Sequence, residues 1–167
     1  KGGYNPISYH NGSVWPHDNS LIVAGLARYG FITEATQVVS GLLGALRHFP
    51  DYRLPELFAG YSRTEAPFPV EYPTTSRPQA WASCAIFLLL TTMIGLDLTE
   101  QTVRSTAFLP EGVHRLRIDG LWIGRRRVSV EVTRSPDGVV SRVIDDLSNT
   151  RMREATPPLE RTTLTAF

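Results

Sequence analysis

The chain has 167 residues, of which 42% are hydrophobic and 20% are charged. This composition supports one packed domain with a modest appendage and excludes a wholly disordered chain. The formal net charge is +1, so no overall field indicates nucleic acid, a membrane surface or an acidic partner. The single cysteine, Cys84, excludes an internal disulfide, which is typical of a cytoplasmic protein, and it is expected to be buried.

The first part of the chain predicts two helices. Residues 1–15 are rich in Gly, Asn and aromatic residues, as loops are, and Pro16 suits the first turn of a helix. Gly30 is expected to end that helix, and Thr33 to cap a second helix that ends at Pro50. Apolar residues recur at helical spacing in both segments. The two helices are therefore expected to form an antiparallel hairpin.

A long connection over 50–77 follows, and its five prolines keep it extended. Connections of this length inside a compact domain are often functional. A third helix is expected to start at Pro78 and to end near Gly95. Because it is apolar on almost all sides, it must be covered by other parts of the protein. Its uncharged run, 80–96, is at the lower limit for spanning a membrane, but its polar residues favour a buried core helix.

After the third helix the pattern changes to short apolar runs, with strict alternation at 128–133. Together with the turn signal at 136–138, these runs predict a small antiparallel sheet of about four strands. The polar residues 148–167 are expected to form a flexible tail. The chain is therefore expected to divide into a helical part over 1–96, a small β appendage over 97–147 and that tail.

Two segments contain the residues that could carry chemistry. The first, 9–19, places Trp15, His17 and Asp18 where a loop enters a helix. An indole ring can cover the apolar face of a sugar, while imidazole and carboxylate groups bind its hydroxyls. A polar helix cap explains the same residues equally well, because Asp18 suits the positive end of a helix.

The second segment, 54–60, places the carboxylate of Glu56 between apolar neighbours. Partial burial raises the pKa of a carboxyl group, and acid–base catalysis uses such tuning. The alternative is an exposed Glu56 above packed leucines, and the residues alone favour this alternative. No cluster of His, Cys or carboxylate residues has the spacing of metal ligands, so neither a metal nor another cofactor is expected.

Three short motifs follow one another in the sequence: NGSVWPHDN at 11–19, LPELFAG at 54–60 and SRPQAWA at 76–82. They resemble the NG(T/S)VWP, E-(I/L)-F-x-G and QAW(A/S) segments of (α/α)6-barrel glycoside hydrolases of the amylo-α-1,6-glucosidase, or glycogen-debranching, type. Residues 109–110 and 116–124 resemble the β appendage that closes many chains of this six-hairpin glycosidase family.

The resemblance, which covers about residues 3–134, implies a mainly α fold, with part of an (α/α)6 toroid of helical hairpins followed by a small antiparallel β segment. It also implies an inverting hydrolase of carbohydrate metabolism that acts on α-glucan oligosaccharides in the cytoplasm. In such enzymes a carboxylic acid protonates the leaving oxygen while a carboxylate activates water, and Glu56 matches that catalytic base. The substrate is then expected to contact Trp15, His17, Asp18, Gln79 and Trp81.

No segment matches the general acid of these enzymes, so the chain alone is expected to have little or no hydrolase activity. The remaining part of the barrel, or a second copy of the chain, is expected to cover the apolar third helix. The alternative function is a non-catalytic carbohydrate-binding or structural fragment, in which Trp122 of the β segment contacts the glycan. A further alternative is a small helical interaction module without a sugar ligand.

Overall fold

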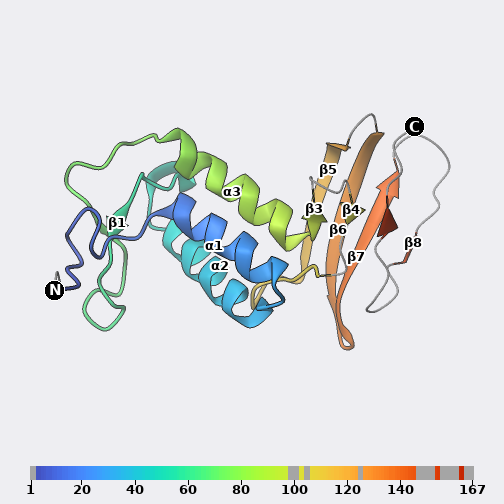
Figure 1. The fold of residues 1–167 in the computed structure, drawn as a ribbon, viewed down its shortest axis with the longest axis horizontal. Helices are drawn as coiled ribbons and strands as arrows, with labels where there is room; N and C mark the ends of the chain where they lie inside the picture. Colours follow the sequence, from blue (N-terminus) through green and yellow to red (C-terminus); the bar gives the residue numbers. More distant parts are fainter. Residues whose placement is uncertain are drawn as a thin grey trace.

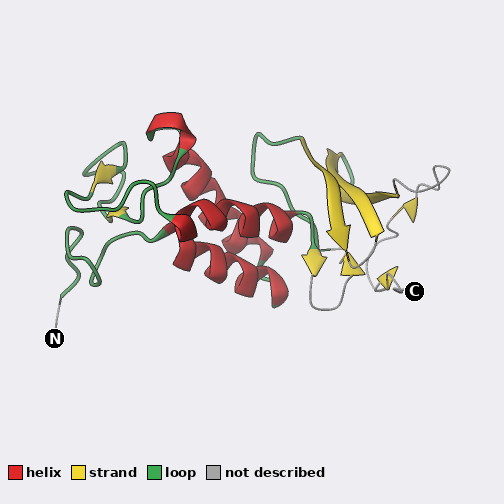
Figure 2. Cartoon of the chain, turned by 90° about the horizontal axis from the view of Figure 1, so that it is seen from above, coloured by secondary structure: helices red, strands yellow, loops and turns green. Residues whose placement is uncertain are grey.

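A computed structural model of the protein describes residues 3–97, 102–103, 106–123, 126–145, 153–154 and 162–163. In this part of the chain, three α-helices lie between a region of loops and an antiparallel sheet (Figure 1). The helices are α1 (Pro16–Arg28), α2 (Ile32–Leu46) and α3 (Ala80–Met93), and a 3-10 turn, η1, covers Pro50–Tyr52. The loops that precede α1 lie at one end of the helices, and the sheet lies at the opposite end (Figure 2).

This architecture corrects the expected fold class. The described residues form a mixed α/β fold of three helices and small antiparallel sheets, and they contain no toroid of helical hairpins. The physical reason is how the helices are covered. α1 packs against both α2 and α3, and apolar residues of these helices are buried against the β part and not against further helical hairpins.

The helices begin and end close to the signals in the sequence. α1 has Pro16 at its first position and is followed by Gly30, whose φ of 85° is left-handed. α2 begins one residue before Thr33, so Thr33 lies inside the helix and is not its cap. α3 begins at Ala80, two residues after Pro78. α1 and α2 run antiparallel, as the sequence predicts (Figure 1).

Within the described residues, α3 is covered on one face only. One face is buried, and it consists of Ala82, Ala85, Leu89 and Met93. On the other side Phe87 is 70% exposed, and Cys84, which was expected to be buried, is exposed too. Within the described ranges, no helix combines the length and the apolar character needed to cross a membrane.

The β part is built mainly on a four-stranded antiparallel sheet in the order β5-β6-β7-β8. Its strands are β5 (Arg115–Ile123), β6 (Arg126–Ser135), β7 (Gly138–Asp145) and β8 (Arg153–Glu154). The predicted turn at 136–138 joins β6 to β7. A β-bulge between Ile118 and Leu121 interrupts the pairing of β5 with β6.

Short strands complete the secondary structure. They are β1 (Phe58–Ala59), β2 (Val70–Glu71), β3 (Leu96–Asp97), β4 (Thr102–Val103) and β9 (Thr162–Thr163). β1 and β2 pair antiparallel within the long connection, and β3-β4-β9 form a second small sheet. Of the segment 148–167, which was expected to be a flexible tail, β8 and β9 are described, and the rest lies outside the described residues.

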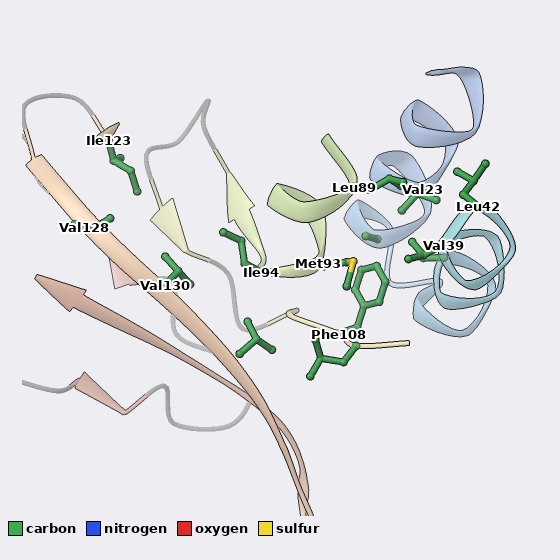
Figure 3. Close-up of a cluster of buried hydrophobic side chains, with 14 residues drawn as sticks. Val23, Val39, Leu42, Leu89, Met93, Ile94, Phe108, Ile123, Val128 and Val130 are labelled. Atoms are coloured by element: carbon green, nitrogen blue, oxygen red, sulfur yellow. The ribbon is translucent and has the colours of Figure 1, made fainter. Parts of the chain in front are cut away.

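One hydrophobic core joins the helices to the sheet (Figure 3). The helices contribute Val23, Val39, Leu42, Leu89 and Met93, and the sheet contributes Ile123, Val128, Val130 and Val132. Phe108, from the segment before β5, packs in the same cluster, and its N–H donates to the carbonyl oxygen of Met93 at 3.0 Å. A second, smaller cluster of Ala45, Phe49, Leu54, Phe58 and Ala82 packs the loops against the other end of α2 and α3.

Candidate functional site

The loops singled out by the sequence gather at the end of the helices that lies away from the sheet (Figure 2). α1 and α3 begin at this end, and α2 ends there (Figure 1). Side chains from the segment before α1 and from the first turns of α1 and α3 therefore come together, although they are far apart in the sequence.

The segment 54–59 lies at the centre of this region, and each of its residues is buried. On one side, the N–H of Phe58 donates to the carbonyl oxygen of Val14 at 3.0 Å, and the N–H of Val14 donates back at 2.8 Å. On the other side, the N–H of Glu56 donates to the carbonyl oxygen of Ser76 at 3.1 Å. The segment thus fixes the N-terminal loop and the end of the long connection relative to each other.

Gly60 allows a close approach of two backbones beside this segment. Its N–H donates to the carbonyl oxygen of Pro6 at 2.9 Å, and its own carbonyl accepts a hydrogen bond from the Tyr4 hydroxyl. A Cβ atom at Gly60 would fall on the carbonyl oxygen of Gly12. Only glycine therefore fits here, and this contact holds the segment 9–19 against the segment 54–60.

The side chain of Glu56 points into the protein and is 7% exposed. Its Oε1 accepts a hydrogen bond from the Tyr9 hydroxyl at 2.9 Å, and its Oε2 accepts one from the N–H of Ser76 at 3.3 Å. The hydrogen bond to Glu56 raises the pKa of Tyr9 above its ordinary value, and burial adds to the effect. The residues alone favoured an exposed Glu56, and that prediction is wrong, because the side chain is buried.

An open hollow of about 590 Å³ lies beside Tyr9, within the range of roughly 300–1,000 Å³ typical of small-molecule sites. Its lining consists of Tyr9, His10, Ser13, Trp15, His17, Asp18, Asn19, Ile22 and Trp81. Four of the residues that the sequence assigned to substrate binding are therefore brought together. Glu56 is not part of this lining, but its carboxylate is hydrogen-bonded to Tyr9, which is.

The aromatic rings of the hollow contact one another in series. The ring of Trp15 lies edge-to-face with Tyr9, at 4.7 Å between centroids, and with His17, at 5.7 Å. His17 in turn lies 5.0 Å from Trp81. The indole N–H of Trp15 donates to the carbonyl oxygen of Tyr9 at 3.0 Å, which fixes the ring. Trp81 is 46% exposed, so its ring is accessible to a ligand.

His17 and Asp18 bring polar groups to the hollow. The Nε2 atom of His17 lies 3.2 Å from Oδ1 of Asp18. The other ring nitrogen of His17, Nδ1, is buried and has no hydrogen-bond partner among the described residues. Asp18 lies in the first turn of α1, where the helix dipole favours a carboxylate. Asp18 therefore suits the helix end and also faces the hollow, so the two interpretations of this residue are compatible.

Two other residues named in the sequence analysis lie elsewhere. Gln79 is the N-cap of α3, and its side-chain oxygen accepts a hydrogen bond from the N–H of Ala80 at 3.0 Å. Its side chain turns back to its own helix and does not line the hollow. Trp122 is 67% exposed on β5, in the sheet at the opposite end of the helices (Figure 1).

Sequence reasoning assigned no role to Tyr9 or Tyr72. Tyr9 lies in the aromatic-rich segment 9–19, so the sequence indicates a place for it beside Trp15. No pattern in the sequence predicts its hydrogen bond to Glu56. Tyr72 packs against Tyr9 at 5.9 Å between ring centroids. It comes from the long connection, and no spacing in the sequence indicates that contact.

Neither a protein-family model nor a curated protein sequence matches this chain. The resemblance to glycoside hydrolases therefore rests on the short sequence motifs. Among the described residues, no group of three or more His, Cys, Asp and Glu side chains is placed to hold a metal ion.

Proposed function

We propose that this region is the sugar-binding wall of a glycoside hydrolase active site, with Glu56 as the catalytic base. The proposed reaction is inverting hydrolysis of α-glucan oligosaccharides, of the amylo-α-1,6-glucosidase type. The observation that carries the proposal is the contact between a buried carboxylate and an aromatic hollow. Tyr9 lines the hollow and donates its hydroxyl hydrogen bond to Glu56.

The hollow has the mixture of groups that a saccharide needs. The exposed ring of Trp81 offers a flat apolar surface to the C–H face of a pyranose. His17, Asp18 and Asn19 line the same hollow and offer donors and acceptors to sugar hydroxyls. Apolar surface with a few placed polar groups is typical of small-molecule sites.

The proposed role of Glu56 depends on its remaining hydrogen-bonding capacity. A general base must direct a lone pair at the attacking water. Each oxygen of Glu56 accepts one hydrogen bond, from Tyr9 or from Ser76, so each retains another acceptor position. These two donors fix the orientation of the carboxylate. The proposal requires the ring of Tyr9 to move when substrate binds, so that water in the hollow reaches Oε1.

Inverting hydrolysis also needs a carboxylic acid, about 6.5–9.5 Å from the base. Because no segment of this chain matches that acid, we propose that a complementary segment or a second copy of the chain supplies it. Leu21, Ile22 and Phe87 are each more than half exposed and offer apolar surface for such a partner. The proposed compartment is the cytoplasm, since the one cysteine, Cys84, allows no internal disulfide.

Tryptophan fluorescence during titration with maltooligosaccharides and branched α-1,6-linked glucans tests sugar binding. Trp81→Ala is expected to weaken binding by about tenfold or more, because it removes the exposed ring of the hollow. Trp122→Ala is the matched control, since it removes an exposed indole from the sheet, and it should leave the affinity unchanged. Loss of binding in Trp122→Ala alone would contradict the proposed site.

α-Glucosyl fluoride tests the role of Glu56 separately. Fluoride leaves without help from a general acid, so the base alone should accelerate hydrolysis of this compound. Fluoride release is expected to be faster with the natural chain than with Glu56→Gln, while both release little glucose from ordinary glucans. The second candidate, a non-catalytic carbohydrate-binding module, is favoured by the absence of Glu56 from the lining of the hollow. If the natural chain and Glu56→Gln bind sugar equally well and release fluoride at the same rate, the non-catalytic module is the correct interpretation.

A further inference from the structure

A second cavity, of about 490 Å³, lies between the C-terminal half of α2 and the connection that follows β1. α2 contributes Gly41 and Gly44, the residue after α2 contributes Arg47, and the connection contributes Tyr61, Arg63 and Phe68. Asn19 lines this cavity and also the aromatic hollow, so the two are neighbours at the same end of the helices.

The charged side chains that line this cavity carry the same sign. Arg47 and Arg63 line it together with His48, and its lining includes no Asp or Glu. In the ranges that the structure describes, neither arginine forms an ion pair with a carboxylate. The negative end of α2 accounts for a cation at Arg47, but not for a second guanidinium beside an empty space. Paired guanidinium groups are typical of sites that bind phosphate.

The two arginines line the same cavity, although they come from different segments. A terminal nitrogen of the Arg63 guanidinium lies 3.5 Å from the position that a Cβ atom would take at Gly44. Gly44 and Arg47 are three residues apart, which places them on the same face of the helix end. Arg63 therefore reaches from the connection to the helix face that leads to Arg47.

Gly41 and Gly44 leave the α2 side of the cavity without side chains at these two positions. Glycine is less favourable than alanine inside a helix. A Cβ atom at Gly41 would meet no atom within 4 Å, so close packing does not require glycine there. The wall is open on the side where the guanidinium groups lie, which suits a ligand that rests against α2.

We propose that this cavity binds a sugar phosphate. The phosphate lies between Arg47 and Arg63, and the sugar ring packs against Tyr61 and Phe68, which are 38% and 58% exposed. A free phosphate ion would use only the arginines, whereas a ring also uses the aromatic side chains. The inference is independent of the proposed hydrolase, because it concerns other residues and another ligand.

Isothermal titration calorimetry with glucose 6-phosphate, glucose and inorganic phosphate tests this site. Glucose 6-phosphate is expected to bind at least about tenfold more tightly than either of the other two, because only it uses both walls. Arg47→Ala and Arg63→Ala should each weaken its binding by about tenfold or more. Arg28→Ala removes the same charge from the exposed end of α1 and should leave binding unchanged.

Gly41→Leu blocks the cavity without changing its charge. Leucine is a better helix former than glycine, so the variant should melt no lower than the natural chain while losing about tenfold or more in affinity for glucose 6-phosphate. If an arginine variant folds poorly, the affinity of Gly41→Leu for glucose 6-phosphate still tests whether the ligand occupies this cavity. The proposal is overturned if Gly41→Leu still binds glucose 6-phosphate with the natural affinity. It is also overturned if inorganic phosphate binds as tightly as glucose 6-phosphate, or if glucose 6-phosphate does not bind at millimolar concentration.

Discussion

Replacing Phe108 with alanine is expected to remove a large part of the stability of the chain. Phe108 is 3% exposed and packs in the core that joins the helices to the sheet. Burial of an aromatic side chain removes roughly 200 Å² from water, which at about 25 cal/mol per Å² corresponds to about 5 kcal/mol. Alanine retains the Cβ atom, so the expected loss is about 3–4 kcal/mol of a total of about 5–15 kcal/mol.

Urea unfolding measures this loss with two observables. Far-ultraviolet circular dichroism follows the helices, and amide hydrogen exchange of β6 follows the sheet. Both should report the same decrease, because helices and sheet share the cluster around Phe108. Phe87→Ala makes the same chemical change at a side chain that is 70% exposed, and it should cost less than about 1 kcal/mol. A decrease confined to one observable, or one below about 1 kcal/mol for Phe108→Ala, would refute the single shared core.

Two further predictions concern the loops around the hollow. Because the hydrogen bond to Glu56 raises the pKa of Tyr9, this tyrosine should stay protonated at a pH where an exposed one has ionised. Its contribution to stability is complete below the unfolded-state pKa of about 10 and is lost as pH rises through the higher folded-state value. Difference titration of tyrosinate absorbance against Tyr9→Phe measures this step, and Glu56→Gln should move it to lower pH; a step that stays put would contradict the contact. Gly60→Ala should destabilise the chain by about 1–3 kcal/mol, because its Cβ would fall on the backbone of Gly12. Thermal unfolding measures the loss in Gly60→Ala. In the control Gly3→Ala the new Cβ meets no atom within 4 Å, so the midpoint of unfolding should be unchanged.

The elements that the sequence predicted well are those with local causes. Pro16 and Gly30 mark the ends of α1 because each restricts or permits particular backbone angles within the segment itself. The turn at 136–138 likewise joins β6 to β7. The toroid was expected from the resemblance of short motifs, and motifs of this length do not specify which surface covers a helix. Here the valines of β6 share a core with the helices.

The candidate site was predictable to a similar extent. Trp15, His17 and Asp18 lie close together in the sequence, so their common place in the hollow follows from one loop entering one helix. The arrival of Trp81 depends on α3 packing beside α1, which no local pattern specifies. Gln79 was a reasonable candidate, but its amide could equally bond to the first N–H of its own helix, and the structure has that bond.

The two backbone bonds between Val14 and Phe58 make one wall of the hollow a rigid unit. Trp15 follows one member of this pair and Glu56 precedes the other by two residues, so the backbones of the two residues are held in place relative to each other, while the bond from the Trp15 indole N–H to the Tyr9 carbonyl oxygen holds the ring. Trp81 is mounted on a different helix and is not tied to that pair. Adjustment to ligands of different width should therefore come from the α3 side and from the ring of Tyr9, while the backbone around Val14 and Phe58 keeps its position.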